Sequence, residues 1–153
     1  MAVIGTVRDF NTRWKFLFEI DNFGYSGFQT CSELKVSAAE VTHYEGGVII
    51  PDKQPGKLTY DDVTLTRGAT VDRDLYDWMN EVGNAAKHAG LAASRFKRNA
   101  TLVQQDRDGR TKLRWNIYGC WPKEFVAGSW DNDSDEVVIE SVVLAIDRFE
   151  LRR

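Results

Sequence analysis

The sequence predicts a mainly β fold, an antiparallel β-sandwich or barrel with one flanking α-helix and a long protruding hairpin loop. Three observations lead to this prediction. Apolar and polar residues alternate near the start of the chain, an Asp-Gly pair joins two strand-like runs, and only the segment of about 72–89 has a helical period. A chain of 153 residues, 42% of them hydrophobic, is the size of one domain. We therefore expect a single domain over 1–153, with an N-terminal arm over 1–11.

The first predicted strand is WKFLFEID, residues 14–21. Its large apolar residues share one parity and are expected to face the core: Trp14, Phe16, Phe18 and Ile20. Residues 28–45 are also typical of extended structure, but Ala38 and Ala39 interrupt the alternation. Such an interruption predicts a β-bulge.

A long hairpin loop is predicted over about 44–58. The stretch EGGVIIPDKQPGKLTYDD contains paired glycines and two prolines, which favour turns. Between them stand three consecutive β-branched residues, Val48, Ile49 and Ile50, which are unusual in a solvated loop. Just after the loop, the apolar residues change parity within KLTYDDVTLTRG, which predicts a bulge near Asp61 and Asp62.

The predicted helix begins with Asp72 as a plausible N-cap and has Asp74 in its first turn. Gly90 suits the C-cap. The apolar residues recur at steps of three and four, which is the helical period: Leu75, Trp78, Met79, Val82, Ala86 and Ala89. Trp78 is therefore expected to pack in the core.

The remainder of the chain is predicted to be β-strand. NATLVQQ and KLRWNIYGCW flank a turn with Asp108-Gly109, a strong hairpin signal. The acidic stretch DNDSD then predicts a solvated loop. The last segment, VVIESVVLAIDRFEL, is apolar on both parities, so we expect protein to cover both of its faces.

Charge and composition exclude several classes of function. The net charge of -3 and the pI of about 5.4 give no basic field, which disfavours a protein whose main task is to bind nucleic-acid phosphates. The chain shows no secretory signal and no run of about eighteen apolar residues, so we expect synthesis in the cytosol and no membrane partner. In that compartment Cys31 and Cys120 are expected to be free thiols.

No motif predicts catalysis or metal binding. The two histidines, His43 and His88, have no neighbouring ligand at metal-binding spacing. Asp131, Asp133 and Asp135 resemble the start of a calcium loop, but the sixth and twelfth positions of that loop are wrong. We therefore expect no enzyme, no cofactor and no metal.

The unexplained features are apolar surfaces that need a cover. They are the run from Val48 to Ile50, the terminal strand, and the short apolar arm AVIG at the N-terminus. A partner would cover them, or the loop could fold back onto its own domain. If the partner is another copy, a hairpin that docks elsewhere on the next subunit closes a ring or continues as a filament.

A series of ordered blocks resembles a known family. FLFEID, HYEGG, PGKLTYDDVTLTRGATVDRDLYDW, WNIYGCWPKEF and VVIESVVLAI, at these spacings, resemble the tail tube proteins of contractile-tailed bacteriophages. The same family includes the inner-tube proteins of extracellular contractile injection systems. The likeness extends from about Trp14 to Phe149.

The resemblance implies a structural subunit of a virion tail, assembled in the host bacterial cytoplasm. Hexameric rings would stack into a hollow tube inside a contractile sheath, and DNA or another payload would pass through it. Self, sheath, baseplate, tail terminator and tape measure proteins are the implied partners, with DNA in the lumen bound without sequence specificity. The hairpin would reach the adjacent ring, while neighbouring subunits in one ring would join their sheets into a continuous inner barrel.

Two sets of residues follow as expectations. The predicted contacts between rings or subunits are Tyr44, Glu45, Gly46, Gly47, Val48, Ile49, Ile50, Pro55, Gly56, Lys57, Arg67 and Gly68. The residues that could face the lumen are Lys15, Glu19, Asp61, Asp62 and Glu140, a mixed set that leans acidic. Like charge facing DNA would prevent sticking, which suits a conduit.

Alternative functions remain open at the level of the sequence. The closest is a tube-initiating ring of the baseplate, or the inner tube of an injection system rather than of a phage. A small barrel that binds an apolar ligand predicts a monomer with an open internal pocket, whereas a tube subunit predicts a filled core and exposed apolar edges. An enzyme would need a convergent acid, base or metal cluster.

Overall fold

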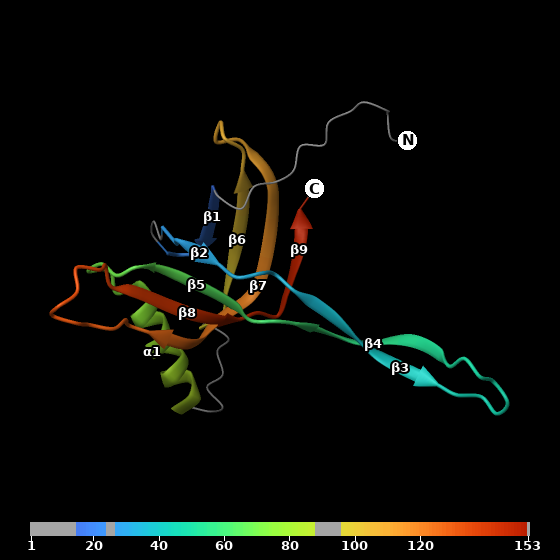
Figure 1. Ribbon diagram of the computed structural model, residues 1–153. Helices are drawn as coiled ribbons and strands as arrows, with labels where there is room; N and C mark the ends of the chain where they lie inside the picture. Colours follow the sequence, from blue (N-terminus) through green and yellow to red (C-terminus); the bar gives the residue numbers. More distant parts are fainter. Residues whose placement is uncertain (1–14, 24–26, 88–95, 153) are drawn as a thin grey trace.

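The computed structural model describes residues 15–23, 27–87 and 96–152, with only the backbone described for 85–87 (Figure 1). The N-terminal arm, Trp14, His88 and the expected C-cap Gly90 therefore lie outside the described residues. The elements in chain order are β1 (Phe16–Ile20), β2 (Thr30–Cys31), β3 (Val36–His43), β4 (Asp52–Tyr60), β5 (Val63–Gly68), α1 (Asp74–Lys87), β6 (Arg98–Gln105), β7 (Thr111–Val126), β8 (Ile139–Ala145) and β9 (Arg148–Arg152).

The main sheet has seven strands, in the order β1-β6-β7-β8-β5-β2, with β9 also paired to β7. All of its pairings are antiparallel. The long strand β7 belongs to two halves of this sheet: it pairs with β6 and β9 up to Cys120 and with β8 from Trp121 onward. The halves face each other as in a sandwich and do not close into a barrel. The prediction of a mainly β, sandwich-like fold with one helix is confirmed.

Gly119 lies where β7 passes from one half of the sheet to the other. Its φ is +68°, in the left-handed region that favours glycine. A Cβ added there would stand 2.0 Å from Oδ2 of Asp147, whose backbone N–H donates to the carbonyl of Tyr118. Glycine therefore permits both the backbone conformation and the close approach of the β8–β9 connection.

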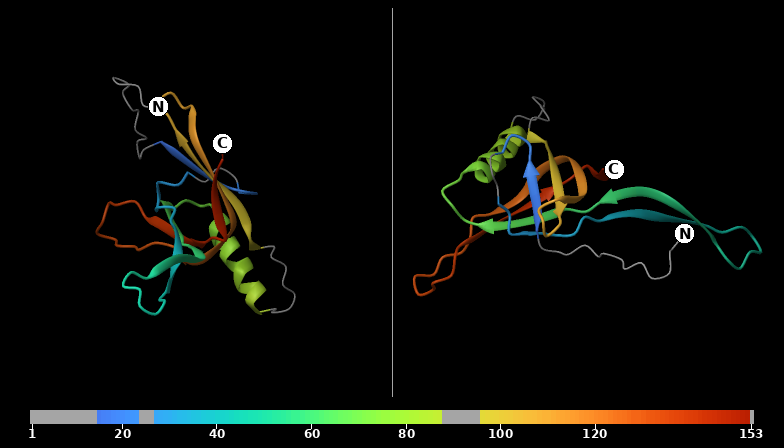
Figure 2. Two further views of the ribbon diagram at one scale, coloured as in Figure 1. Left: turned by 90° about the vertical axis from the view of Figure 1, so that its right-hand side faces the viewer. Right: turned by 90° about the horizontal axis from the view of Figure 1, so that it is seen from above.

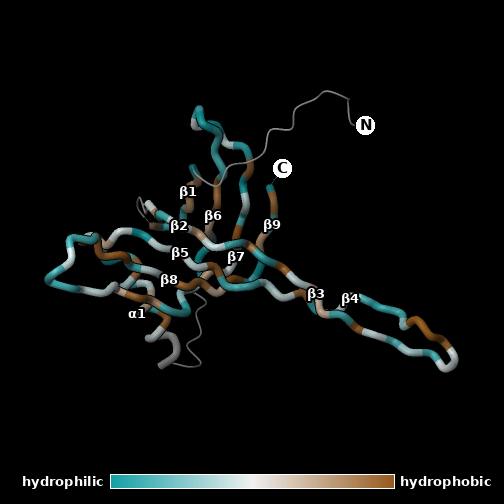
Figure 3. Tube along the Cα trace, in the orientation of Figure 1, coloured by the Kyte–Doolittle hydropathy of each residue, from teal (hydrophilic) through white to brown (hydrophobic). Residues whose placement is uncertain are grey.

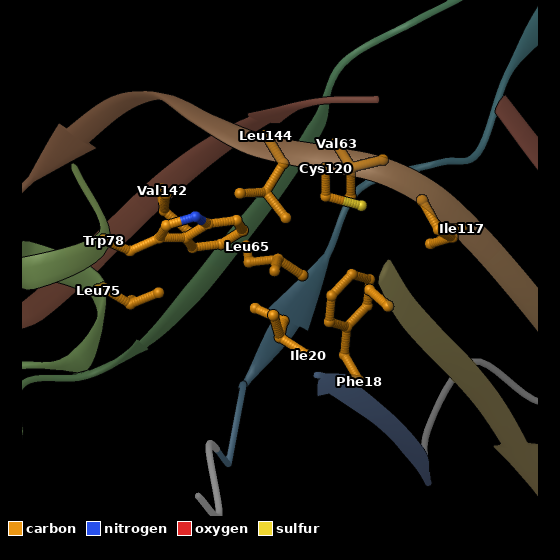
Figure 4. Close-up of a cluster of buried hydrophobic side chains, with 11 residues drawn as sticks. Phe18, Ile20, Val63, Leu65, Leu75, Trp78, Ile117, Cys120, Val142 and Leu144 are labelled. Carbon is orange, nitrogen blue, oxygen red and sulfur yellow. The ribbon is translucent and has the colours of Figure 1, made fainter. Parts of the chain in front are cut away.

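The core fills the space between the two halves of the sheet and under the helix (Figure 4). It draws on five strands and the helix, and its buried side chains are Phe18, Ile20, Val63, Leu65, Leu75, Trp78, Ala100, Ile117, Cys120, Val142 and Leu144. Phe18 and Ile20 share a parity in β1, as the alternation predicted. Trp78 is buried as predicted, and its indole N–H donates to the carbonyl of Phe96 at 2.6 Å.

Helix α1 begins at Asp74, two residues after the expected N-cap. The backbone N–H of Asp72 donates instead to the Thr70 hydroxyl, and the carbonyl of Arg73 accepts from Asp77. Asp74 and Asp77 place negative charge in the first turn, which complements the helix dipole as expected.

The protruding hairpin is formed by β3 and β4, which pair only with each other in the described chain (Figures 1 and 2). Residues 52–58, expected in a loop, are strand, and the connecting loop covers only 44–51. The expected bulge is confirmed, because the register shifts between Ala38 and Glu40. Gly56 packs there: an added Cβ would lie 3.1 Å from the carbonyl oxygen of Ala39.

Two strand predictions need correction. Asp61 and Asp62 do not form a bulge; they separate β4 from β5, two strands in different sheets, and this explains the change of parity. The terminal segment is two strands rather than one, since β8 pairs with β5 and β7 whereas β9 pairs with the first part of β7. The Asp108-Gly109 turn between β6 and β7 is confirmed, with Gly109 at φ +82°.

Candidate assembly surfaces

The hairpin tip, defined here as Val48, Ile49 and Ile50, is an exposed apolar surface far from the core (Figure 3). These side chains are 53%, 96% and 78% exposed. A turn sets them in place: the N–H of Val48 donates to the carbonyl of Glu45 at 3.2 Å, and Gly47 has a φ of +86°. The tip therefore does not fold back onto its own domain.

Most of the predicted contact residues lie along this one hairpin. Tyr44 is 71% exposed, and Glu45 is also exposed beside the tip. No atom would lie within 4 Å of a Cβ added at either Gly46 or Gly47. The remaining hairpin members of the set lie in the stem, within β4: Pro55, Gly56 and Lys57.

Arg67 and Gly68 lie apart from the hairpin, in β5 of the main sheet, with Gly68 half-buried. The Arg67 side chain is buried and forms an ion cluster. Its Nε donates to Oε1 of Glu140 in β8, its Nη2 donates to Oδ1 of Asp74 at 2.5 Å, and its guanidinium lies 5.6 Å from the centre of the Phe28 ring. The cluster joins β5, β8 and the first turn of α1 inside one subunit.

The cluster shifts the pKa values of two of its members. Burial by itself raises the pKa of the Asp74 carboxyl, but the hydrogen bond and charge of Arg67 outweigh it, so this pKa lies below its usual value. Burial lowers the pKa of Arg67, and its hydrogen bonds to Asp74 and Glu140 more than compensate, so the net shift is upward. Both shifts favour the charged forms of Arg67 and Asp74 in the folded subunit.

Burial of this cluster changes both predicted residue sets. Glu140, an expected lumen residue, is only 6% exposed in the subunit and is bonded to Arg67. Arg67 is 5% exposed and its side chain is used within the subunit. The charged groups of both residues are thus paired within one subunit.

The other four residues of the predicted lumen set lie at two places. Glu19 is exposed on β1, and Lys15, just before β1, donates to the carbonyl of Arg107 at 2.5 Å. Asp61 and Asp62 lie at the β4–β5 junction, where Asp61 pairs with Lys35 at 3.6 Å and Asp62 pairs with Lys123 at 3.0 Å. The structure does not gather these four into one row.

The strand register reveals a charged row that the sequence analysis missed. On the outer face of the β1-β6-β7-β9 half, Glu19 lies opposite Thr101, Thr101 opposite Asn116, and Asn116 opposite Glu150. In the adjacent row Arg114 lies directly opposite Arg152, and both are exposed. Alternation within each strand marks these residues as outward-facing, but only the pairing register shows that charges of one sign share a row.

A second apolar surface lies at the end of the molecule opposite the hairpin. A groove of about 450 Å³ lies there, with apolar residues making up most of its lining and with Thr70, Asp72, Arg73 and Glu140 as polar neighbours. Its larger apolar side chains are Tyr76, Phe125, Trp130 and Val138. Trp130 is 73% exposed and Tyr76 is 48% exposed. This groove is called the end groove below; Phe125 in its wall also packs against the core, whereas Tyr76 and Trp130 belong to the surface.

Neither cysteine is suited to nucleophilic chemistry. Cys31 and Cys120 are both free thiols, as predicted. Burial raises the pKa of Cys31 to about 11, and burial with the nearby negative charges of Asp147 and Asp21 raises that of Cys120 to about 12. Both thiols are therefore protonated at neutral pH. Within the described residues, no three His, Cys, Asp or Glu side chains are grouped to hold a metal ion.

The alternative of a ligand-binding barrel predicts an open pocket inside the fold. The interior is packed with side chains (Figure 4). A cavity of about 720 Å³ lies at the open side of the sandwich, between β1, β2 and β6, and is lined by Phe16, Phe28 and Leu102 with polar neighbours. A filled core with exposed apolar ends matches the expectation for an assembling subunit. Across the described part of the chain, no helix has the length and apolarity needed to cross a bilayer.

The comparison with family models decides the family. Residues 12–150 match the model described as T4-like virus tail tube protein gp19. The chain belongs to this tail tube family. Because the match covers nearly the whole chain, this tail tube protein is a structural tail component and not an enzyme, in agreement with the sequence-based expectation.

Solved structures show the same fold in related assemblies. A chain from the anti-feeding prophage cap, described as a tube-terminating cap, is 18% identical over 99% of both chains, with a TM-score of 0.83. Chains from an extracellular contractile injection system, PVC, are each 21% identical. One comes from the sheath/tube terminator; its TM-score is 0.81, and the match covers 97% of this chain and 100% of that chain. The other comes from the sheath-tube complex; its TM-score is 0.77, and the match covers 93% of this chain and 90% of that chain.

More distant likeness extends to Hcp1 from Flavobacterium johnsoniae, at 10% identity, 89% coverage of this chain, 93% of that chain and a TM-score of 0.57. A search of curated protein sequences finds no match. The tail tube protein thus shares its fold with components of contractile injection systems.

Proposed function

We propose that this tail tube protein is a single-domain subunit that forms hexameric rings, and that these rings stack into a hollow inner tube within a contractile sheath. The tube would be a conduit for DNA or another payload during ejection. The family supports a tube role in general, and the geometry of the subunit supports stacking in particular.

The observation that carries the proposal is the hairpin. It projects from the sandwich with β3 exposed along its whole length and an apolar tip at its end (Figures 1 and 3). A two-stranded hairpin is at best marginally stable in water by itself. Burial of its tip by a neighbouring ring would remove the apolar surface from water and fix the hairpin.

Ring formation is supported by the edges of the main sheet. Within the described residues β1 pairs only with β6, and β9 pairs only with β7, so each presents one open edge. Open edges readily pair with another chain. Because the two edges differ, pairing one with the other between copies is heterologous, and such contacts close into rings when the rotation allows.

The further partners are part of the same proposal. A sheath protein would surround the tube, baseplate and terminator proteins would bind its ends, and a tape measure protein and then DNA would occupy the lumen. Assembly would take place in the host bacterial cytoplasm. The outer face of the β1-β6-β7-β9 half carries glutamates in one row and arginines in the next, so both signs of charge would face the lumen if this face lines it.

Replacing the tip tests the stacking step. The triple variant Val48→Ser, Ile49→Ser, Ile50→Ser is expected to keep the fold, because the tip touches no core residue, but to lose long tubes. Negative-stain electron microscopy over a concentration series, with circular dichroism for the fold, measures both effects. Wild-type protein is expected to give tubes of uniform width, and the variant isolated rings or monomers.

A matched control is Val41→Ser with Leu58→Ser, two exposed apolar residues of the hairpin stem. These changes remove apolar surface from the same hairpin but leave its tip, so they are expected to keep tubes. Tubes of normal length from the tip variant would contradict the assigned role of the tip. Wild-type protein that stays monomeric at every concentration, even with baseplate proteins added as a nucleus, would contradict the proposed function.

A further inference from the structure

The hairpin tip and the end groove are two unpartnered apolar surfaces at opposite ends of one subunit. In Figure 1 the hairpin extends to one side and the 127–138 loop, near the start of α1, lies at the other. The view from above in Figure 2 shows the same separation, so the two features lie far apart along the longest direction of the molecule. The tip of a subunit therefore cannot occupy its own groove.

The groove has the size and chemistry to accept the tip. Its volume of about 450 Å³ falls within the range of about 300–1,000 Å³ that encloses small organic ligands. Tyr76 and Phe125 form a tilted ring pair with centres 6.4 Å apart, and Trp130 adds a third aromatic ring to the lining. Aliphatic side chains such as Ile49 and Ile50 are suitable occupants for an aromatic lining, because the contact removes apolar area of the tip and of the groove from water.

Local contacts fix the walls of the groove. Gly128, at φ +132°, allows the two ends of the 127–138 loop to lie close together: a Cβ there would stand 2.4 Å from Cγ1 of Val138. The N–H of Ala69 donates to the carbonyl of Val138 at 2.8 Å, which ties the end of this loop to the segment that follows β5. Within the loop, the N–H of Ser134 donates to the carbonyl of Asp131, next to the exposed Trp130.

We infer that the end groove is the receptor for the hairpin tip of a second copy of this chain, so that Ile49 of one subunit contacts Trp130 of the next. This inference rests on the proposed function, since it names the surface that meets the tip between rings. The contact is heterologous, and repetition of it along one axis gives a filament.

The energetics favour a second copy in a polymer over a lone partner. Burial of three aliphatic side chains is a modest gain, and the loss of translational and rotational freedom on association offsets much of it. One tip in one groove therefore holds two subunits only weakly. A ring that presents several tips at once gains by multivalency, because each contact after the first is intramolecular.

Cysteine cross-linking tests the inference directly. One chain carries Ile49→Cys and another carries Trp130→Cys, both with Cys31→Ser, while the fully buried Cys120 is kept. Equal amounts are mixed, oxidised with glutathione disulfide and run on a non-reducing gel. A disulfide-linked dimer is expected in the mixture at a yield at least tenfold above either chain alone. The control mixture replaces Trp130→Cys with Leu151→Cys, an exposed apolar position on β9, and is expected to give only the background yield.

The outcomes separate the inference from the proposed function. If wild-type protein forms tubes but residues 49 and 130 do not cross-link, the inference is wrong and the tube function stands. A cross-linked dimer from Ile49→Cys alone would indicate tip-to-tip contact and would also overturn it. If the mixture cross-links while wild-type protein forms no tubes, the tip-to-groove contact is supported and the stacked tube is not.

Discussion

Replacing Arg67 with methionine is expected to destabilise the folded subunit by about 3–5 kcal/mol. The change leaves the buried carboxylate of Glu140 without its cation, and an uncompensated buried charge is among the most costly defects in a protein. It also removes the hydrogen bond that Arg67 donates to Asp74 at the start of α1. Urea unfolding followed by circular dichroism measures the loss as a lower midpoint.

A second replacement shows whether the lone charge is the cause. The double variant Arg67→Met, Glu140→Met places two apolar side chains where the ion pair stood, and it is expected to recover most of the lost stability. If the double variant were as unstable as Arg67→Met, loss of the Arg67–Glu140 pairing would not explain the defect. The poorer fit of the methionine side chain, or the lost hydrogen bond from Arg67 to Asp74, would then account for the lower stability.

The pH dependence of the wild-type protein gives an independent check on this cluster. The folded-state pKa of Asp74 is lowered, so its contribution to stability is present above the unfolded pKa, about 3.9 for Asp, and is lost as the pH falls through the folded value. Arg67→Met lacks this contribution, because it removes the hydrogen bond and the positive charge that lower the pKa of Asp74. The stability difference between the two proteins is therefore expected to shrink from pH 7 to pH 3.

Replacing Trp78 with alanine is expected to cost about 3–5 kcal/mol. Trp78 is 1% exposed, and its ring packs edge-on against Phe23 at 5.2 Å and beneath the guanidinium of Arg98 at 5.7 Å. Truncation leaves a large cavity between α1 and the sheet and removes the donor to the carbonyl of Phe96. The measurement is again the urea midpoint, read by circular dichroism because a tryptophan is lost.

Two variants of the same helix serve as controls. Trp78→Phe keeps most of the apolar volume and loses only the N–H donor, so we expect an intermediate loss. Tyr76→Ala lies two residues away on the exposed side and is expected to change stability by less than about 1 kcal/mol. Equal destabilisation by Tyr76→Ala and Trp78→Ala would show that the helix is not anchored through Trp78.

Elements that bury one face could be predicted from the sequence, because their apolar residues recur with the period of a strand or of a helix. Phe18 and Ile20 in β1 are such a case, and the period of α1 is equally clear. The helix starts two residues after the expected N-cap: the carbonyl of Arg73 accepts the bond from Asp77, and Asp74 instead of Asp72 uses its carboxylate at the helix start, accepting from the N–H of Leu75.

Strand breaks were harder to predict than strands. Apolar residues on both parities hid the boundary between β8 and β9. The boundary follows from strand pairing, since β8 pairs with β5 and the second part of β7 whereas β9 pairs with the first part of β7. The parity change at Asp61 and Asp62 was detected, but its meaning depended on which strands pair, and that information is not local.

The ion cluster could have been found in part. Glu140 shares its parity with Val142 and Leu144, and Arg67 shares its parity with Val63 and Leu65, so each charge was marked as buried. Two buried charges of opposite sign predict a pair. Their separation of 73 residues in sequence hid the partnership, and the resemblance to a family placed both at assembly sites instead.

The end groove could not have been predicted from the sequence. Tyr76, Phe125 and Trp130 come from the helix, from the end of β7 and from a loop, and nothing in their spacing brings them together. The hairpin tip, by contrast, is a continuous run that the breaker residues around it made visible in the sequence, although its exposure had to come from the structure. Continuous surfaces are thus visible in a sequence, whereas composite ones need the fold.

The pairing of β5 with β8 also determines when the subunit can fold as it leaves the ribosome. The hairpin pairs residues within 36–60 and can form early, but β5 gains its main partner only when residues 139–145 have been made. At about 5–20 residues per second, the apolar tip exists for roughly 5–20 s before the core can close. A nascent chain therefore exposes its apolar hairpin tip before its core has folded. When many copies are translated close together, this exposure favours premature association unless the tip is shielded in that interval.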